Sequence, residues 1–146
     1  MIISRAPLRI GLAGGGTDLP SFYTKHGGFI TTMAINHHIY VTFHRNVLDK
    51  KVRVQYLHTE EVPNVAAITN GRARCVLQHF GLEDQCEITS IGELPCGSGL
   101  GSSSGYTVAL INNIQEYQCL RYSKHQIADT ACHIEINALG EPIGKQ

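Results

Sequence analysis

Two clusters of glycine constrain the fold of this chain more than any other feature of its sequence. Seven of the fifteen glycines fall in residues 11–16 and 97–101. Each cluster follows a stretch that reads as a strand and precedes one with helical spacing. Glycine lets the backbone approach another group closely, and the N–H groups at a helix N-terminus attract anions. The sequence therefore predicts two strand–loop–helix junctions that contact a ligand.

The rest of the pattern alternates strands with helices, which predicts an α+β or α/β domain. β-branched and aromatic residues dominate 29–45, so this segment is expected to form one long strand or two. Ser123 and Gln126 form a capping box that opens the last helix. A buried helical stripe is expected from Val108, Leu110, Ile111, Ile114 and Tyr117. Further strands are expected at 2–12, 51–58 (as a candidate edge strand) and 86–92, and helices from an Asp18 N-cap to Gly27, at 65–80, at 103–119 and from Ser123 to about Leu139.

Composition argues against several classes of function. The chain is 42% hydrophobic with a formal net charge of zero, which is typical of a globular protein and indicates no nucleic-acid or membrane-surface footprint. Arg5, Pro7 and Arg9 interrupt any signal-peptide core, and the uncharged segment 94–115 holds too much Gly, Ser, Pro and Asn to span a membrane. No C-x-x-C pair indicates a zinc or redox motif. We therefore expect a cytoplasmic protein with no nucleic-acid or membrane partner.

The first glycine cluster has the spacing G-x-x-G-x-G over residues 11–16, so a dinucleotide-binding fold has to be considered. That fold requires an acidic residue for the ribose about 20 residues later. No Asp or Glu occurs between Leu19 and Leu48, and the following helix is short because Gly27 and Gly28 stop it. The first cluster is therefore not expected to bind a dinucleotide.

The second glycine cluster allows other interpretations. It is no Walker A loop, because that motif needs a lysine and this loop has none. Gly101–Gly105 matches the G-x-S-x-G of serine hydrolases, with Ser103 as the nucleophile. Asp129 and His133 follow in the required order, but they lie one turn apart on one predicted helix and would not converge on Ser103. A hydrolase is therefore a weaker alternative to a phosphate-binding loop.

Two motifs resemble the GHMP kinase superfamily, which includes galactokinase, homoserine kinase and mevalonate kinase. Pro95–Ser104 reads PCGSGLGSSS and resembles the phosphate loop P-x-x-x-G-L-G-S-S-A, with Ser104 in place of Ala. Residues 5–23 read RAPLRIGLAGGGTDLPSFY and resemble the opening of the sugar kinases, most of all the kinases of D-glycero-D-manno-heptose 7-phosphate and next the fucokinases. The resemblance implies an α+β fold of the GHMP kinase N-terminal type, with a mixed sheet, helices packed on one side and the phosphate loop at a helix N-terminus.

The resemblance also implies roles for the residues that match the family pattern. The loop would wrap the phosphates of ATP with its backbone N–H groups, and Ser103 with Glu135 would bind Mg²⁺. Arg9 would be the catalytic cation that stabilises charge between the nucleophile and the γ-phosphate. Asp18 would accept hydrogen bonds from sugar hydroxyls. The implied ATP-binding residues are Pro95, Gly97, Ser98, Gly99, Leu100, Gly101, Ser102, Ser103 and Ser104, and the sugar-binding residues are Gly15, Gly16, Thr17 and Asp18.

Each of these assignments has a purely structural alternative. The serines at 102–104 could serve only to cap a helix, and Asp18 could be an N-cap. Arg9 could pair with a surface acid at a strand edge, and Glu135 could be an exposed charge on a helix. The surroundings of these side chains distinguish the two sets of roles.

The family pattern is incomplete in this chain. The family's catalytic aspartate follows the magnesium glutamate in a context such as G-x-Q-D-Q, whereas the chain reads Gly144-Lys145-Gln146 and stops. The resemblance therefore implies that residues 1–146 are the N-terminal, ATP-binding half of a sugar kinase without its C-terminal domain, and that the isolated chain has little or no turnover. A non-catalytic nucleotide- or sugar-binding module is the alternative.

The expected substrate is a small-molecule sugar or sugar phosphate, with heptose 7-phosphate favoured by the resemblance. A sugar phosphate needs a second anion site. Four cationic residues are candidates for it, and the sequence gives no way to choose among Lys25, Arg45, Arg72 and Arg74.

Overall fold

A computed structural model describes residues 1–145, and a five-stranded mixed sheet forms its framework. The strand order is β1-β2-β5-β3-β4, in which only β3 and β5 run parallel and the other neighbouring pairs are antiparallel. The strands span β1 Ile2–Ala13, β2 Thr31–Arg45, β3 Val52–Gln55, β4 Thr59–Val62 and β5 Cys86–Gly92.

The long pairing of β1 with β2 is interrupted by a register shift between Pro7 and Arg9. Proline has no N–H to donate to the ladder, so it is tolerated at such an irregularity. Arg9 follows the shift, and its backbone N–H donates to the carbonyl of Leu100, 2.9 Å away. At this irregularity, the hydrogen bond from Arg9 to Leu100 thus connects β1 to the second glycine cluster.

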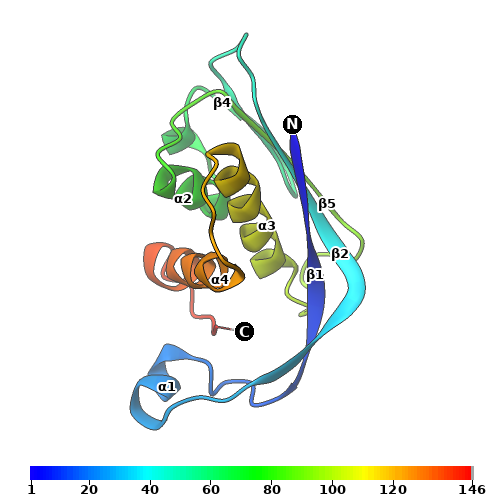
Figure 1. The fold of residues 1–146 in the computed structure, drawn as a ribbon, viewed down its shortest axis with the longest axis vertical. Coiled ribbons are helices and arrows are strands. Elements are labelled where there is room, and N and C mark those ends of the chain that lie inside the picture. The colour runs from blue at the N-terminus through cyan, green and yellow to red at the C-terminus, as the bar shows by residue number, and fades with distance from the viewer. Residues whose placement is uncertain (146) are drawn as a thin grey trace.

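Helices α2, α3 and α4 lie on one face of the sheet, whereas α1 lies beyond the end of β1 and β2 (Figure 1). Helix α3 contacts both β1 and β2, and helices α4 and α2 pack against it. The sheet contributes alternate residues such as Val41, Phe43 and Ile88 to a core that also holds Leu110 and Ile114 of α3. No helix within residues 1–145 is long and apolar enough to cross a bilayer. The helices are α1 Pro20–His26, α2 Gly71–His79, α3 Ser102–Tyr117 and α4 Lys124–Cys132, with a 3₁₀ turn η1 at Val65–Ala67 and a π-helical segment η2 at His133–Ala138.

This architecture confirms the expected α+β class with a mixed sheet and helices on one side. The segment 29–45 forms a single strand from Thr31 onward. The expected edge strand at 51–58 is wrong in detail, because β3 ends at Gln55 and the chain turns back as β4, which takes the edge. The expected helix at 65–80 is broken, since Asn64 caps the 3₁₀ turn and Asn70 caps α2 through a bond from the N–H of Ala73.

Three other helices differ in detail from the expectation. Leu19, not Asp18, is the N-cap of α1, because the Asp18 carboxylate accepts a hydrogen bond from the N–H of Gly16 instead. The expected stripe on α3 is buried at Leu110, Ile111 and Ile114, whereas Val108 is half-buried and Tyr117 is 43% exposed beyond the edge of the core. The last helix reaches Ala138 as expected, but its final six residues are π-helical.

The capping box at Ser123 fixes the start of α4, which leads directly into η2. The Ser123 hydroxyl accepts from the N–H of Gln126 at 3.3 Å, and the Gln126 side chain accepts from the N–H of Ser123 at 2.8 Å. We predict that Ser123→Ala lowers the free energy of unfolding by about 1 kcal/mol, because the N–H of Gln126 at the helix start loses its acceptor. Urea unfolding measures this loss. Ser21→Ala on exposed α1 is the control, and equal effects of the two substitutions would contradict the prediction.

Candidate functional site

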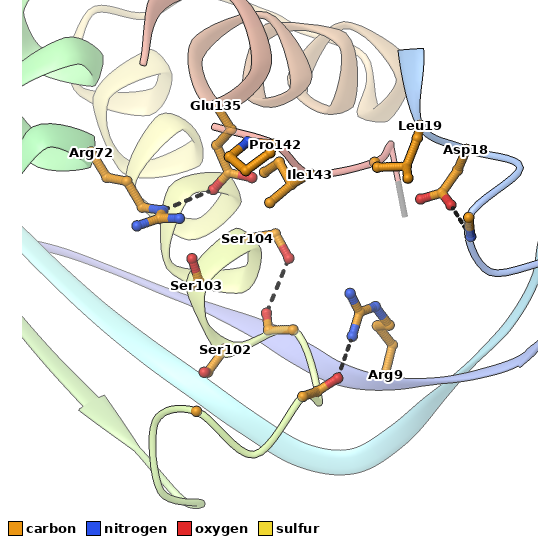
Figure 2. A pocket seen from close by; sticks show the side chains of 15 residues that line it. Arg9, Asp18, Leu19, Arg72, Ser102, Ser103, Ser104, Glu135, Pro142 and Ile143 are labelled. Atoms are coloured by element: carbon orange, nitrogen blue, oxygen red, sulfur yellow. Dashed lines mark hydrogen bonds and ion pairs between the residues drawn. The ribbon is translucent and has the colours of Figure 1, made fainter. Parts of the chain in front are cut away.

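The two glycine clusters meet at one cleft of about 520 Å³ (Figure 2). Gly16 of the first cluster and Asp18, which follows it, line one side of the cleft. The loop of the second cluster and the first turn of α3 line another side. The remaining wall comes from β1, α2, η2 and the segment after η2. The residues around the cleft are Arg9, Gly16, Asp18, Leu19, Arg72, Gly97, Gly99, Gly101, Ser102, Ser103, Ser104, Glu135, Pro142, Ile143 and Gly144.

The second cluster forms a loop whose glycines adopt backbone conformations that side chains disfavour. Gly97, Gly99 and Gly101 have φ values of 82°, 73° and 79°. Gly101 is the N-cap of α3, and no side chain caps the helix start. The serines that follow therefore do not cap α3; Ser104 donates instead to the carbonyl of Gly101 at 3.2 Å. The first-turn N–H groups of α3 stay available to an anion.

Arg9 fixes this loop from the side of β1. Its Nη1 donates to the carbonyl of Gly99 at 2.8 Å, in addition to the backbone bond to Leu100. Its Nε is buried, with no hydrogen-bond partner within residues 1–145. An unpaired buried donor is costly, and an anion in the cleft would satisfy it. Arg9 is therefore not the partner of a surface acid; its guanidinium faces the loop and the cleft (Figure 2).

In the first cluster, only part of the expected sugar-binding set reaches the cleft. Asp18 is 9% exposed, and its Oδ1 accepts from the N–H of Gly16 at 2.9 Å. Thr17 folds the loop instead, because its hydroxyl lies 2.7 Å from the carbonyl of Gly14 and 2.9 Å from that of Phe29. Gly15 and Thr17 lie outside the cleft lining, as do Pro95, Ser98 and Leu100 of the second loop.

The segment after η2 closes the cleft on the side of Asp18. The Lys145 N–H donates to the backbone carbonyl of Asp18 at 3.3 Å. A Cβ on Gly144 would lie 1.7 Å from Oδ2 of Asp18, so a side chain at this position would displace the Asp18 carboxylate. Gln146, the last residue of the expected G-x-Q context, lies outside the described residues.

Glu135 is buried rather than exposed, with 4% of its surface accessible. It lies in the first turn of η2, and its Oε1 accepts from the Thr107 hydroxyl at 2.6 Å and from Nε of Arg72 at 3.2 Å. Nη2 of Arg72 also contacts the carboxylate of Glu141. π-Helical turns are frequent at functional sites, and here the turn carries a buried carboxylate on the side of the cleft where Ser103 lies (Figure 2).

The donor set of the cleft fits a cation that arrives with a phosphate ligand. No group of three or more His, Cys, Asp or Glu side chains that could hold a metal occurs within residues 1–145. Mg²⁺ keeps several waters and is usually bound through one or two carboxylates plus substrate phosphates. Glu135 and Ser103, which line the same cleft at the helix N-terminus, meet that smaller requirement.

Two tyrosines lie close together beside this loop. The rings of Tyr56 and Tyr106 are 4.7 Å apart, and Sγ of Cys96 lies 3.8 Å from the Tyr56 hydroxyl. Burial, followed by the contact with Cys96, raises the pKa of Tyr56 to about 12. Burial raises the pKa of Tyr106 as well, and its hydroxyl has no partner within the described chain. Both phenols are therefore neutral near pH 7.

Glu93 anchors the start of the loop to β2. Its carboxylate accepts from the hydroxyl of Tyr40 at 3.1 Å and from the N–H of His38 at 3.2 Å, and it lies 3.1 Å from Nδ1 of His37. Partial burial opposes ionisation, but these hydrogen bonds outweigh it and lower the pKa of Glu93. The carboxylate therefore stays ionised at neutral pH and fixes the chain as it leaves β5.

The structure distinguishes among the four candidate cations for a second anion site. Of these, only Arg72 lines the cleft. Arg45 pairs with Asp84, and Arg74 donates to the carbonyl of Ile68. The sequence could not place Arg72 at the cleft, because this residue belongs to no motif and approaches the cleft only through the packing of α2. Thr107 and Glu141 were missed for the same reason.

The hydrolase alternative gains no support from this geometry. Asp129 pairs with His125 at 3.1 Å, and both side chains are largely exposed on α4. The ring of His133 lies beside that of His79, with the centroids 6.4 Å apart. A catalytic triad needs the acid to orient the histidine and the histidine to contact the serine, and Asp129 is engaged elsewhere.

Comparisons with known proteins agree with the two motifs. Residues 66–146 match the family model of the GHMP kinases N terminal domain. The chain is 28% identical to the D-glycero-alpha-D-manno-heptose 7-phosphate kinase of Campylobacter jejuni over 99% of this chain and 46% of that protein. It is 25% identical to the L-fucokinase/L-fucose-1-P guanylyltransferase of Bacteroides fragilis, over 92% of this chain and 18% of that protein.

A solved structure extends the agreement to the fold. The D-glycero-D-manno-heptose 1-phosphate kinase of Bacteroides thetaiotaomicron superposes with a TM-score of 0.87 at 26% identity, over 100% of this chain and 51% of that one. The chain thus spans about half the length of the heptose phosphate kinases that it matches. The resemblance found in the sequence is confirmed, whereas the roles of individual residues stay predictions.

The contact between Arg9 and Gly101 gives a test of how the loop is held. A Cβ on Gly101 would lie 3.0 Å from Cζ of Arg9, whereas a Cβ on Gly97 meets nothing within 4 Å. Both substitutions to Ala impose a backbone penalty of about 1–2 kcal/mol at positive φ. We predict that Gly101→Ala lowers the free energy of unfolding more than Gly97→Ala does, because only Gly101→Ala displaces Arg9. Urea unfolding of both variants checks this, and equal losses would show that Arg9 does not constrain the loop.

Proposed function

The chain belongs to the GHMP kinase family, and from this membership we propose that it provides the ATP site and part of the sugar site of a sugar kinase. In this proposal, residues 1–146 correspond to the N-terminal domain, and a C-terminal domain completes the enzyme. The coverage of 46% and 51% of two heptose phosphate kinases supports this division.

One observation carries the proposal. The uncapped N-terminus of α3, reached through three glycines with positive φ, shares a cleft with Arg9, Asp18 and Glu135. Catalysis of phosphoryl transfer to a hydroxyl rests on positioning and charge stabilisation. The reaction therefore requires an anion site, here at a helix start, together with a permanent cation and two carboxylates at separate points.

The roles follow from the chemistry of each group. Backbone N–H groups of the loop and of the first turn of α3 would bind the phosphates of ATP, and Ser103 with Glu135 would hold Mg²⁺. Mg²⁺ supplies positive charge to the phosphate oxygens. Arg9 places its guanidinium beside the loop, where it stabilises charge that develops as the phosphoryl group moves. The Asp18 carboxylate would accept a hydrogen bond from a sugar hydroxyl.

For the acceptor, we propose a sugar or sugar phosphate, with heptose 7-phosphate first. This preference rests on the name of the Campylobacter jejuni relative and on the sugar-kinase form of residues 5–23. The general base is assigned to none of residues 1–145. Turnover is therefore expected from the whole kinase, and this chain alone is expected to bind nucleotide with little or no transfer.

The nucleotide site can be tested by binding of a fluorescent ATP analogue to the protein expressed from its full reading frame. Ser103→Ala is predicted to weaken binding at least about tenfold in the presence of Mg²⁺, since a bond to a charged group contributes about 1.5–3 kcal/mol. Without Mg²⁺ the variant and the parent should bind alike. Ser90→Ala on β5 is the control. Binding that responds neither to Ser103→Ala nor to a chelator would contradict the magnesium site.

The sugar site can be tested separately through Asp18. Asp18→Asn keeps the size of the side chain and its bond from Gly16, but it removes the charge. We predict that this substitution weakens binding of heptose 7-phosphate roughly tenfold or more while the affinity for ATP stays the same. Calorimetry with a non-hydrolysable ATP analogue present measures both affinities. An unchanged sugar affinity would remove Asp18 from the site, and tight binding of both ligands without phosphoryl transfer would favour a binding module.

A further inference from the structure

Thr107 lies between the two residues to which the metal site is assigned. Its hydroxyl is 2.6 Å from Oε1 of Glu135 and 3.3 Å from the backbone carbonyl of Ser103. A hydroxyl has one proton to donate, and a threonine within a helix often gives it to the carbonyl four residues earlier. Here the shorter, charge-assisted contact takes the proton, so Thr107, which is fully buried, is committed to Glu135.

Arg72 approaches the same carboxylate oxygen from α2. Its Nε lies 3.2 Å from Oε1 of Glu135, and its Nη2 contacts Glu141. The guanidinium is thus held as a fork between two carboxylates, which fixes its own orientation. One positive charge faces two negative charges, so the group as a whole keeps a net negative charge that favours a further cation.

Both donors bind Oε1 and leave Oε2 of Glu135 to the cleft. A carboxylate that ligates a metal is commonly hydrogen-bonded in turn, and such bonds orient it. We propose that Thr107 and Arg72 are positioning residues for the metal, which hold Oε1 so that Oε2 of Glu135 is presented beside Ser103. This inference rests on the proposed function, because it concerns the same cleft and the same cation.

The proposal also assigns Arg72 to one end of the cleft. Arg72 lies on the side of Ser103 and Glu135, whereas Asp18 and Arg9 lie at the other end (Figure 2). Nε and Nη2 of Arg72 are both engaged by carboxylates. Arg72 therefore supports the nucleotide and metal side, and it does not serve as the second anion site for a sugar phosphate.

The test uses Mn²⁺, a paramagnetic substitute for Mg²⁺, with a non-hydrolysable ATP analogue and the protein from its full reading frame. Bound Mn²⁺ is measured by electron paramagnetic resonance, so the readout does not depend on turnover. Thr107→Val keeps the shape of the side chain and removes the hydroxyl, and we expect Mn²⁺ affinity to fall roughly tenfold or more. Thr107→Ser keeps the hydroxyl and should restore most of the affinity. Nucleotide affinity without metal should be unchanged in both variants.

Arg72→Lys provides a second, independent test that keeps the positive charge. A lysine cannot donate to Glu135 and Glu141 as a fixed fork, so Mn²⁺ affinity is again expected to fall roughly tenfold. If Thr107→Val does not fold, Arg72→Lys carries the test. An increase in Mn²⁺ affinity in Arg72→Lys would show that Arg72 competes with the cation, and it would overturn the proposal.

Glu135→Gln separates failure of this inference from failure of the proposed function. If Glu135→Gln leaves Mn²⁺ binding unchanged, the magnesium site itself is wrong. If Glu135→Gln abolishes Mn²⁺ binding while Thr107→Val and Arg72→Lys bind Mn²⁺ like the parent, the proposed function stands and the positioning roles are refuted.

Discussion

The geometry of the cleft depends on the contact between Arg9 and the second glycine loop. Strand β1 and this loop are some ninety residues apart in sequence, and Arg9 joins them through both its backbone N–H and its side chain. Because the guanidinium lies against Gly101, a side chain at that position would displace Arg9. A single long-range contact thus places the cation, shapes the loop and sets where α3 begins.

The sequence predicted those parts of the structure whose causes are local. Strand alternation, the capping box at Ser123 and the glycine pattern each act within a few residues, and they identified the class of fold and most of the elements. The errors arose where polar side chains redirect the backbone. Asn70 starts α2 later than hydrophobic spacing indicates, and Asp18 binds Gly16 rather than capping α1.

The same division applies to the cleft. Ser103 and Glu135 could be named from the sequence because they match the pattern of the family that the two motifs resemble. Arg72 and Thr107 have no such match, and they reach Glu135 only after α2, α3 and η2 have packed together. Residues that bind a ligand directly are thus easier to find in a sequence than the residues that hold them in position, which are specified by tertiary contacts.

The burial of Glu135 explains why these supporting residues are needed. A carboxylate that is 4% exposed has lost most of its hydration, and a buried charge is tolerated only when it is paired and hydrogen-bonded. Arg72 and Thr107 supply the pair and the bond, but Glu141 draws on the same arginine. The contacts with Arg72 and Thr107 are therefore enough to keep Glu135 buried, but the cluster of Arg72, Glu135 and Glu141 still carries a net negative charge. A divalent cation in the cleft would neutralise that charge.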